Sequence, residues 1–314
     1  MSAISRLDPK KFKDPQKTAS GEKRAFVEPR QLQILWVNTG TLCNIACSNC
    51  YIESSPRNDR LSYLKASELR QFLEEIRRDS WGTEEIGFTG GEPFMNPEMI
   101  PMLEDVLSRG FRALVLTNAM KPMLNKQDAL KALSQWFGNT LTLRVSIDHY
   151  HSEKHETERG TGTWQPMLEG IKFLTANGIS FDIAGRKKWD EDELELRDGY
   201  AALFKKYSID VDAYDPIHLT LFPEMDSLAD VPEITTSCWD ILGVDQSDLM
   251  CSNSRMLIKR TGERKPSLVS CTLLPYEPEF ELGQTIEEAW KPVALNHPHC
   301  AKFCVLGGGA CSAN

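Results

Sequence analysis

Short apolar runs alternate with helical patterns of apolar and polar residues from about residue 31 to about residue 222. This alternation is typical of repeated βα units around a parallel sheet. We count six units. The predicted strands are Leu32–Val37, Glu85–Thr89, Ala113–Thr117, Leu141–Ile147, Ile179–Ala184 and Val211–Leu221, the last with a break near Pro216.

The segments between these strands carry apolar residues at helical spacing. One helix is predicted to begin near Ser67, with Ser67 as its N-cap, and to turn one apolar face toward the sheet: Leu69, Phe72, Leu73 and Ile76. A second begins at Asn96-Pro97 and runs to Gly110, and others are predicted at 127–137, 164–177 and 191–207. Six βα units form a partial (β/α)6 TIM-like barrel, open on one side, and reactive groups are expected on the loops after the strand C-termini.

The alternation is missing at both ends of the chain. Residues 1–30 mix basic residues with Ser, Gly and Pro and lack an apolar stretch, which predicts a flexible tail and no signal peptide. Residues 230–314 are irregular and rich in Pro, Gly and Cys, so we expect metal ligation to hold this segment together. The predicted fold is α/β: a tail at 1–30, a partial barrel at 31–229 and a small cysteine-rich iron–sulfur domain at 230–314.

Composition limits the function. With 314 residues, 41% of them hydrophobic, the chain can bury a sizeable core. A formal charge of -9 and the absence of a long basic run disfavour a nucleic-acid partner. No segment approaches the roughly 18 continuous apolar residues of a membrane span. These features predict a cytoplasmic enzyme without a membrane partner.

Nine cysteines without a secretory signal favour metal binding over disulfides, because the cytoplasm keeps ordinary thiols reduced. Three of them, Cys43, Cys47 and Cys50, follow the first predicted strand directly with the spacing C-x3-C-x2-C. Three thiolates on one short loop can hold three irons of a [4Fe-4S] cubane and leave the fourth iron open for a small molecule. The alternatives are a zinc site without its fourth ligand, or three buried thiols that act as small apolar side chains.

This loop resembles the cysteine motif of the radical S-adenosylmethionine (SAM) superfamily, whose open iron binds the amino and carboxylate groups of SAM. Asn44 and Tyr51 stand as in the C-N-x-x-C-x-x-C-Y variant of the motif. Many members have an aromatic residue just before the last cysteine, where this chain has Asn49. The resemblance implies a [4Fe-4S] cluster and SAM as cofactors, with Tyr51 near SAM.

A second motif, Gly90-Gly91-Glu92-Pro93, follows the second predicted strand. Two glycines let the backbone approach a ligand closely, and a carboxylate beside them suits an ammonium group. The turn resembles the GGEP element of the superfamily. That resemblance implies that Gly90, Gly91 and Glu92 hold the methionine amino group of SAM. Asn118, after the third strand, belongs to a Thr-Asn ending similar to one that lies near SAM in many members.

Residues 145–160 (VSIDHYHSEKHETERG) are similar to the S-[IL]-D-G-P-x3-H-D-x2-R-G run of the subgroup that includes anaerobic sulfatase-maturating enzymes and peptide maturases. The resemblance implies that Ser146 faces the SAM carboxylate and that Asp148 points into the substrate cavity. His149-Tyr150 replaces the family's Gly-Pro, which predicts a bulkier cavity wall. Asp148 and His149 are therefore candidate catalytic residues on the substrate side. Solvated or hydrogen-bonded loop histidines are favoured over a metal site here, since no Cys or carboxylate pattern completes one.

Arg186, just past the fifth strand, is a candidate partner of the SAM carboxylate, as a cation is in many members. A surface ion pair is the alternative, because Lys187 and Lys188 adjoin it.

Six further cysteines lie in the C-terminal segment: Cys238, Cys251, Cys271, Cys300, Cys304 and Cys311. Four thiolates can ligate one [4Fe-4S] cluster fully, whereas two complete clusters need eight. The segment resembles the SPASM and twitch extensions of radical SAM enzymes, which carry auxiliary clusters. We predict at least one auxiliary [4Fe-4S] cluster, on Cys251, Cys271, Cys300 and Cys304. Cys238 or Cys311 would substitute as ligands or belong to a second, incompletely ligated cluster, and a structural zinc site is the alternative.

The resemblance implies an enzyme that cleaves SAM reductively and uses the 5'-deoxyadenosyl radical to abstract hydrogen from a small molecule or a peptide, for an oxidation, a crosslink or another modification. Its implied partner is a low-potential electron donor such as flavodoxin or ferredoxin. Two other hypotheses stay open. One is an RNA-modifying radical SAM enzyme, which the acidic balance disfavours. The other is a non-catalytic iron–sulfur or zinc-binding protein, which would not need Gly90, Gly91 and Glu92 beside the cysteine loop.

Overall fold

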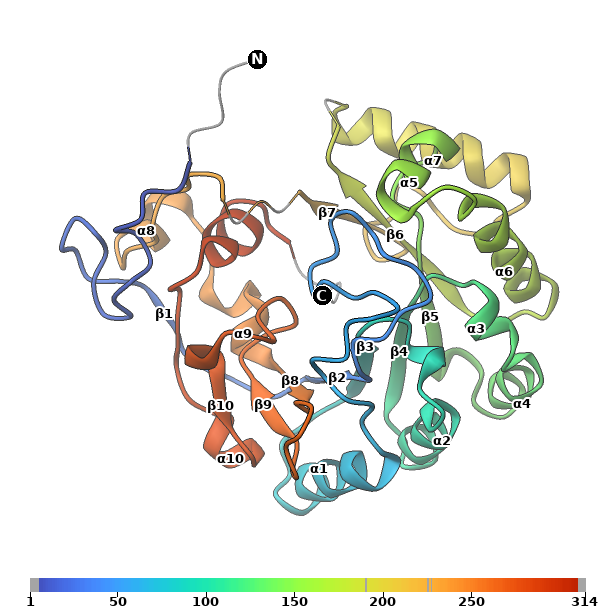
Figure 1. Cartoon of the computed structure of the whole chain (residues 1–314), viewed down its shortest axis with the longest axis horizontal. Coiled ribbons are helices and arrows are strands. Elements are labelled where there is room, and N and C mark those ends of the chain that lie inside the picture. Colours follow the sequence, from blue (N-terminus) through green and yellow to red (C-terminus); the bar gives the residue numbers. More distant parts are fainter. Residues whose placement is uncertain (1–5, 190, 225, 227, 310–314) are drawn as a thin grey trace.

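The computed structural model describes residues 6–189, 191–224, 226 and 228–309. Within this part of the chain, nine strands form one curved sheet in the order β10-β9-β8-β2-β3-β4-β5-β6-β7 (Figure 1). The strands are β2 (Ile34–Asn38), β3 (Glu85–Thr89), β4 (Arg112–Thr117), β5 (Leu141–Ser146), β6 (Phe181–Lys187), β7 (Leu219–Pro223), β8 (Ser254–Ile258), β9 (Ser267–Val269) and β10 (Glu281–Gly283). Strands β2 to β7 pair in parallel, each with the next, so their C-terminal ends meet on one side. The sheet is an open, partial barrel.

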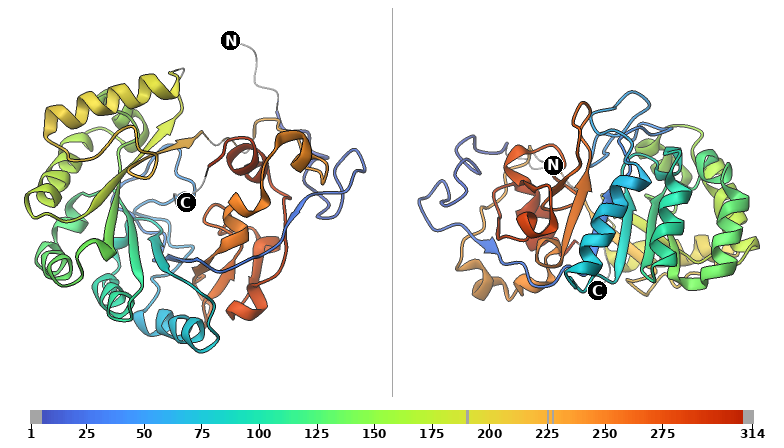
Figure 2. Two further views of the ribbon diagram at one scale, coloured as in Figure 1. Left: turned by 180° about the vertical axis from the view of Figure 1, so that it is seen from behind. Right: turned by 90° about the horizontal axis from the view of Figure 1, so that it is seen from below.

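Helices cover the outer face of the parallel strands, as the curved arrangement in Figure 2 shows. They are α1 (Ala66–Arg78), α2 (Met99–Ser108), α3 (Lys121–Leu124), α4 (Gln127–Phe137), α5 (Ser152–Arg159), α6 (Trp164–Ala176) and α7 (Glu193–Tyr207). The predicted apolar face of α1 is buried in the main core, together with the outward side chains of the strands. Trp36, on the inward face of β2, is fully buried and lies against Gly87 of β3, where a Cβ atom would come within 2.4 Å of the indole ring. The inside of the barrel is therefore packed beneath the strand ends.

One predicted N-cap, one helix start and one strand start were wrong. Ser67 lies inside α1, which begins at Ala66 because the backbone N–H of Lys65 donates to the Glu68 carboxylate at 2.9 Å and so closes the first turn. Helix α2 begins at Met99. The Asn96 side-chain oxygen accepts from the Glu98 N–H at 2.8 Å, and its amide nitrogen donates to two loop carbonyls, so Asn96 stays in the loop before the helix. Strand β7 begins at Leu219, where a turn closed by the Asp215 carbonyl ends.

The C-terminal segment is not an irregular appendage. Strand β8 pairs in parallel with β2, and β9 and β10 continue the sheet in antiparallel fashion. All five residues of β8 are buried. The sequence pattern did not reveal that β8 extends the parallel sheet, because its neighbour β2 lies more than 200 residues earlier. Four short helices complete the segment: α8 (Cys238–Leu242), α9 (Met250–Asn253), α10 (Ile286–Ala289) and a π-helix at Cys300–Val305.

Residues 6–30, predicted as a flexible tail, instead lie against the C-terminal segment (Figure 1). Strand β1 (Phe26–Val27) pairs with β11 (Val293–Ala294). The Arg24 guanidinium is fully buried and bonds Glu233 at 2.5 Å. Phe12 and Val27 join an apolar cluster formed mainly by residues 231–305. We call residues 6–30 the N-terminal clasp. Among the helices of the described residues, none is long and apolar enough to cross a bilayer.

Candidate functional site

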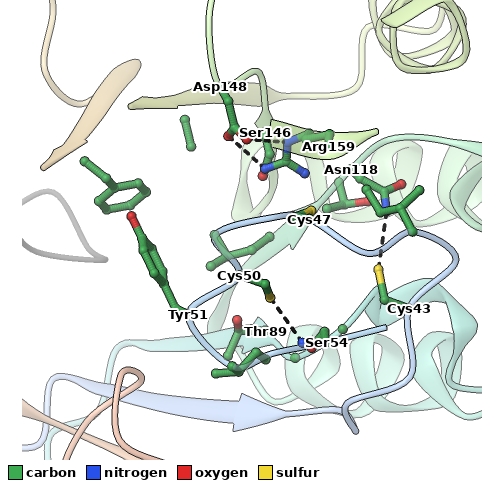
Figure 3. Close-up of a pocket in the computed structure, with 18 of the residues that line it drawn as sticks. Cys43, Cys47, Cys50, Tyr51, Ser54, Thr89, Asn118, Ser146, Asp148 and Arg159 are labelled. Atoms are coloured by element: carbon green, nitrogen blue, oxygen red, sulfur yellow. Dashed lines mark hydrogen bonds and ion pairs between the residues drawn. The ribbon is translucent and has the colours of Figure 1, made fainter. Parts of the chain in front are cut away.

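A cavity opens at the C-terminal ends of the parallel strands, with about 1040 Å³ of space that no protein atom fills. The loop between β2 and α1 places Cys43, Cys47 and Cys50 on one wall of this cavity (Figure 3). Cys43 is buried, and the other two thiols are half-buried. The structure thus brings together the three cysteines that the sequence selected, on a loop that faces an open space.

Glycines let the second motif lie directly against the cysteine loop. The Gly91 N–H donates to the Gly40 carbonyl at 2.8 Å, and the Glu92 N–H donates to the Leu42 carbonyl at 3.2 Å. A Cβ atom on Gly91 would come within 2.1 Å of the Leu42 oxygen, and one on Gly90, which has φ of 132°, would meet the Gly40 oxygen at 2.5 Å. These contacts join the two loops backbone to backbone. Both glycines line the cavity.

Glu92 lies behind this wall, outside the set of lining residues. One carboxylate oxygen accepts from the Thr117 hydroxyl at 2.9 Å and from the Phe94 N–H at 3.2 Å, and the other accepts from the Asn118 N–H at 2.9 Å. Burial raises the pKa of Glu92 to about 7, and these hydrogen bonds oppose the shift. The carboxylate therefore ties the ends of β3 and β4 together. Pro93, next to it, is buried at the start of a short 3₁₀ turn and does not line the cavity.

Asn118 reaches from the end of β4 to the cysteine loop. Its amide donates to the Asn44 side-chain oxygen at 2.9 Å, and its nitrogen lies 3.9 Å from the Cys43 sulfur. Asn118 and Ser146 both line the cavity, and their contact with SAM stays a prediction. The ends of β4 and β5 thus contribute polar groups opposite the thiols.

Asp148 and two arginines form the far wall. Both oxygens of Asp148 accept from Arg159, at 3.0 Å each, and Arg186 lies 3.5 Å away (Figure 3). Burial opposes ionisation of Asp148, but Arg159 and Arg186 outweigh it and lower the pKa of this carboxyl. Asp148 therefore stays charged and holds two guanidiniums at the cavity. It faces the cavity, as the resemblance implies, but as one member of an ion-pair cluster.

Arg186 is a buried cavity residue and not a surface ion pair. It donates to the Asn49 carbonyl at 2.8 Å and lies 4.8 Å from the centre of the Tyr51 ring. Its Nη1 makes no hydrogen bond and lies 4.0 Å from the Glu224 carboxylate. An amino-acid carboxylate fits such a donor. Asn49, in the place of the family's usual aromatic residue, donates its amide to Glu224 beyond the end of β7. The cysteine loop is thereby tied to the last parallel strand.

His149 and Tyr150 do not thicken the cavity wall as predicted. Neither lines the cavity. The Tyr150 ring packs against Gly199 of α7, and the buried His149 ring bonds Glu191 at 3.0 Å. Burial lowers the pKa of His149 to about 4, although Glu191 opposes the shift. The turn after β5 directs both rings outward, so the structure separates His149 from Asp148.

Burial also acts on the thiols of the first site. It raises the pKa of Cys43 to about 12 and raises the pKa of Cys47. Arg159 opposes the shift at Cys47. Metal ligation requires thiolates, so a bound metal group must supply the positive charge that displaces these protons. The three loop thiols, beside an Arg186 nitrogen without a hydrogen bond and the glycine backbone of the cavity, fit an iron–sulfur cluster with an amino-acid ligand.

Three of the C-terminal cysteines gather behind another part of the cavity. Burial raises the pKa of Cys251 to about 12 and that of Cys300 well above its usual value, and the charges of nearby thiolates add to both shifts. Cys271 takes part in both interactions, and the next two residues, Thr272 and Leu273, line the cavity. The segment after Cys271 therefore reaches the cavity of the first cysteine loop, although Cys251, Cys271 and Cys300 themselves do not line it.

The other predicted ligands differ in position. Cys304 packs against the same apolar cluster, four residues after Cys300 in the π-helix. Cys238 begins α8, where its sulfur accepts from the Thr235 N–H at 3.4 Å. Cys311 lies outside the described residues. Electrostatic interactions thus link Cys251, Cys271 and Cys300, although among the described residues no three metal-ligating side chains stand close enough to hold a single metal ion.

Sequence reasoning missed several residues of the site. Arg159 is the arginine of the Arg-Gly pair that ends the 145–160 run, so the motif contained a signal for it. The structure places this arginine in the cavity wall. Thr272 and Leu273 carried no sequence signal, because the turn after β9 reaches the cavity only through the sheet order.

Comparison with known proteins agrees with this geometry. The profile of the radical SAM superfamily matches residues 37–198. The chain is 29% identical over 143 residues to the antilisterial bacteriocin subtilosin biosynthesis protein AlbA of Bacillus subtilis. This alignment covers 45% of the chain and 30% of AlbA. It is 28% identical over 153 residues to an AdoMet-dependent heme synthase of Oleidesulfovibrio alaskensis, with 48% of this chain and 37% of that protein covered. The chain thus spans well under half the length of these relatives.

Among solved structures, Streptococcus suis SuiB bound to the precursor peptide SuiA aligns with a TM-score of 0.59 at 13% identity. The alignment covers 84% of this chain and 65% of that one. This likeness extends the shared fold past residue 198 into the C-terminal segment.

Proposed function

Since this chain belongs to the radical SAM superfamily, whose cofactors are a [4Fe-4S] cluster and SAM, we propose that its cavity is the active site of a hydrogen-abstracting enzyme. When bound, the cluster and SAM supply a 5'-deoxyadenosyl radical. The observation that carries the proposal is the convergence of three loop thiols, two glycines and a buried arginine donor on one cavity.

We propose distinct roles for the residues of this cavity. Cys43, Cys47 and Cys50 hold the cluster. The backbone at Gly90 and Gly91 allows SAM to lie close to the cysteine loop, and Nη1 of Arg186, which makes no hydrogen bond, receives its carboxylate together with Ser146. Asp148 orients Arg159 and Arg186, because its two oxygens bond the first and attract the second. Tyr51 packs on Arg186 and Phe303 and shields this corner from water.

A peptide side chain is our first candidate substrate. Two relatives support it: AlbA, named for the biosynthesis of a bacteriocin, and SuiB, solved with its precursor peptide. The heme synthase supports a small molecule as the second candidate. Auxiliary thiols beside the cavity suit either, since a cluster there can accept an electron from a substrate radical. We place the enzyme in the cytoplasm, with a donor such as flavodoxin or ferredoxin.

The test is anaerobic reconstitution with iron and sulfide, followed by incubation with SAM and dithionite. We expect about eight irons per chain and release of 5'-deoxyadenosine. Cys43→Ala should abolish the release, because the cluster loses one of its ligands. Cys238→Ala is the matched control, and it should keep the release. Bound zinc, or iron without SAM cleavage, would contradict the proposal and favour the non-catalytic hypothesis.

Deuterium transfer separates the two substrate classes. A deuterated peptide should pass deuterium to 5'-deoxyadenosine if a peptide is the substrate. Transfer from a deuterated porphyrin precursor alone would favour the small molecule.

A further inference from the structure

A fully buried guanidinium lies beside the C-terminal thiols. Arg255, on β8, is 0% exposed. It donates to four backbone carbonyls: Cys251 at 2.6 Å, Ser254 at 2.7 Å, Ala289 at 2.9 Å and Lys291 at 3.0 Å. These neutral acceptors satisfy its hydrogen bonds but leave its positive charge without a counter-charge.

Other buried arginines of the chain have a carboxylate partner. Arg24 bonds Glu233 at 2.5 Å, and Arg197 bonds Glu193 at 2.9 Å. Among the residues that the structure describes, no carboxylate lies within ion-pair distance of Arg255. The face of the Trp290 ring, 4.7 Å away, attracts the guanidinium but cannot neutralise it. An unpaired buried charge costs several kcal/mol, so an anion is expected nearby.

The ionisable side chains that act on Arg255 are the thiols of Cys251 and Cys271. Neutral thiols cannot balance a guanidinium. Thiolates that hold an iron–sulfur cluster form an anionic group, and each one-electron reduction adds a further negative charge to it. A fixed positive charge in a buried environment then favours the reduced form.

We propose that Arg255 is the counter-charge of the auxiliary cluster, held on β8 so that it balances the thiolate-bound group and favours its reduced form. Arg255 is a positioning residue, because it acts through the cysteines and touches no substrate. The inference rests on the proposed auxiliary cluster. Reduction takes one electron from the external donor, and Arg255 exchanges no proton.

The test isolates the auxiliary cluster in the full chain by replacing Cys43, Cys47 and Cys50 with Ala. After reconstitution, iron content and an EPR-monitored redox titration are measured with Arg255, Arg255→Lys and Arg255→Gln. We expect Arg255→Gln to lower the ratio of reduced to oxidised cluster at least tenfold at the original midpoint potential, which is about 59 mV for a one-electron couple. Arg255→Lys keeps the positive charge. Its ratio of reduced to oxidised cluster should therefore stay within about threefold of the original, well below the tenfold change.

Arg197→Met is the matched control, because it removes a buried guanidinium that also donates to carbonyls, on α7 at the other end of the sheet. It should leave the potential unchanged. Equal potentials for Arg255 and Arg255→Gln would overturn the inference and leave the proposed function standing. If Arg255→Gln does not fold, Arg255→Lys decides. A tenfold drop in its ratio of reduced to oxidised cluster overturns the inference, and an unchanged ratio supports the inference. Absence of iron in the variant without Cys43, Cys47 and Cys50 would overturn both this inference and the auxiliary cluster. Deoxyadenosine release by the unmodified chain would still test the proposed function of the first site.

Discussion

At the scale of single residues, two buried carboxylates near the cavity have opposite electrostatic surroundings. Asp148 faces Arg159 and Arg186, which lower the pKa of its carboxyl against the effect of burial. Glu92 is held by three hydrogen-bond donors and has no ion-pair partner of its own, with Arg159 as the weakest of the causes that oppose burial, so burial prevails and raises its pKa to about 7. Charge partners decide this difference, because a guanidinium compensates the lost hydration of a carboxylate and a few N–H and O–H groups do so only in part.

Glu92→Gln should therefore change how stability depends on pH. The folded pKa of about 7 lies above the unfolded value of 4.5, so the contribution of Glu92 is fully present below pH 4.5 and is lost as the pH rises through 7. The loss amounts to as much as about 3 kcal/mol. Gln cannot ionise, and its amide nitrogen would face the Asn118 N–H, which costs about 1–3 kcal/mol.

Urea unfolding of both proteins between pH 5 and pH 8 checks this expectation. Glu92→Gln should be destabilising at pH 5 and clearly less so at pH 8. Glu104→Gln, at an exposed position of α2, is the control and should follow the wild type. If Glu92→Gln lowers the free energy of unfolding by the same amount at every pH in this range, Glu92 does not titrate there.

At the scale of elements, the geometry of the site depends on how closely two loops approach. The β3–α2 connection meets the cysteine loop backbone to backbone, and the Gly91 position has no room for a side chain. The glycines serve this packing in addition to any contact with a cofactor. That is why Gly-Gly stands next to a three-cysteine loop in the structure as well as in the motif.

Gly91→Ala should push the two loops apart, because the new Cβ would lie 2.1 Å from the Leu42 oxygen. We expect the buried Cys43 thiol of the apoprotein to react with iodoacetamide at least tenfold faster, by analogy with the 1–3 kcal/mol that overpacking costs. Gly110→Ala is the control, because its Cβ would meet nothing within 4 Å and its φ of 85° adds only backbone strain. Equal Cys43 reactivity in the two variants would mean that the cysteine loop does not depend on this contact.

At the scale of the whole molecule, the two chain ends assemble beside the barrel. The N-terminal clasp covers the apolar cluster of the C-terminal segment, and β8 joins that segment to β2. The C-terminal thiols are therefore held by sheet pairing and by the clasp as well as by any metal group. This arrangement places Thr272 and Leu273 at the cavity that the first cysteine loop also lines.

Arg24→Met should loosen this assembly locally. It leaves Glu233 buried without its partner, which costs about 3–5 kcal/mol. Hydrogen exchange should accelerate in β11 and in residues 231–234 and stay unchanged in β3 to β5. Lys23→Met, at the exposed neighbouring position, should leave every segment protected. Faster exchange in β3 to β5 would instead indicate that clasp and barrel unfold as one unit.

The sequence by itself determined the parallel βα order, the three cysteines of the first loop and the glycines beside them. These features are local: a strand, its apolar spacing and the loop after it lie within one βα unit, and parallel strands bring successive loops to one edge. Five strands were therefore predicted to within about three residues at each end, close to the usual uncertainty of element boundaries. Asn118, Ser146, Asp148 and Arg186 reach the cavity for the same reason.

Only the tertiary structure decided the rest. The pairing of β8 with β2, the clasp, and the gathering of Cys251, Cys271 and Cys300 around Arg255 join residues far apart in the chain, and no local period encodes such contacts. Side-chain direction was equally hidden. The turn after β5 sends His149 outward and Asp148 inward, although the two are neighbours in the sequence. Glu92, likewise, bonds its own strand ends because burial and three donors fix its orientation.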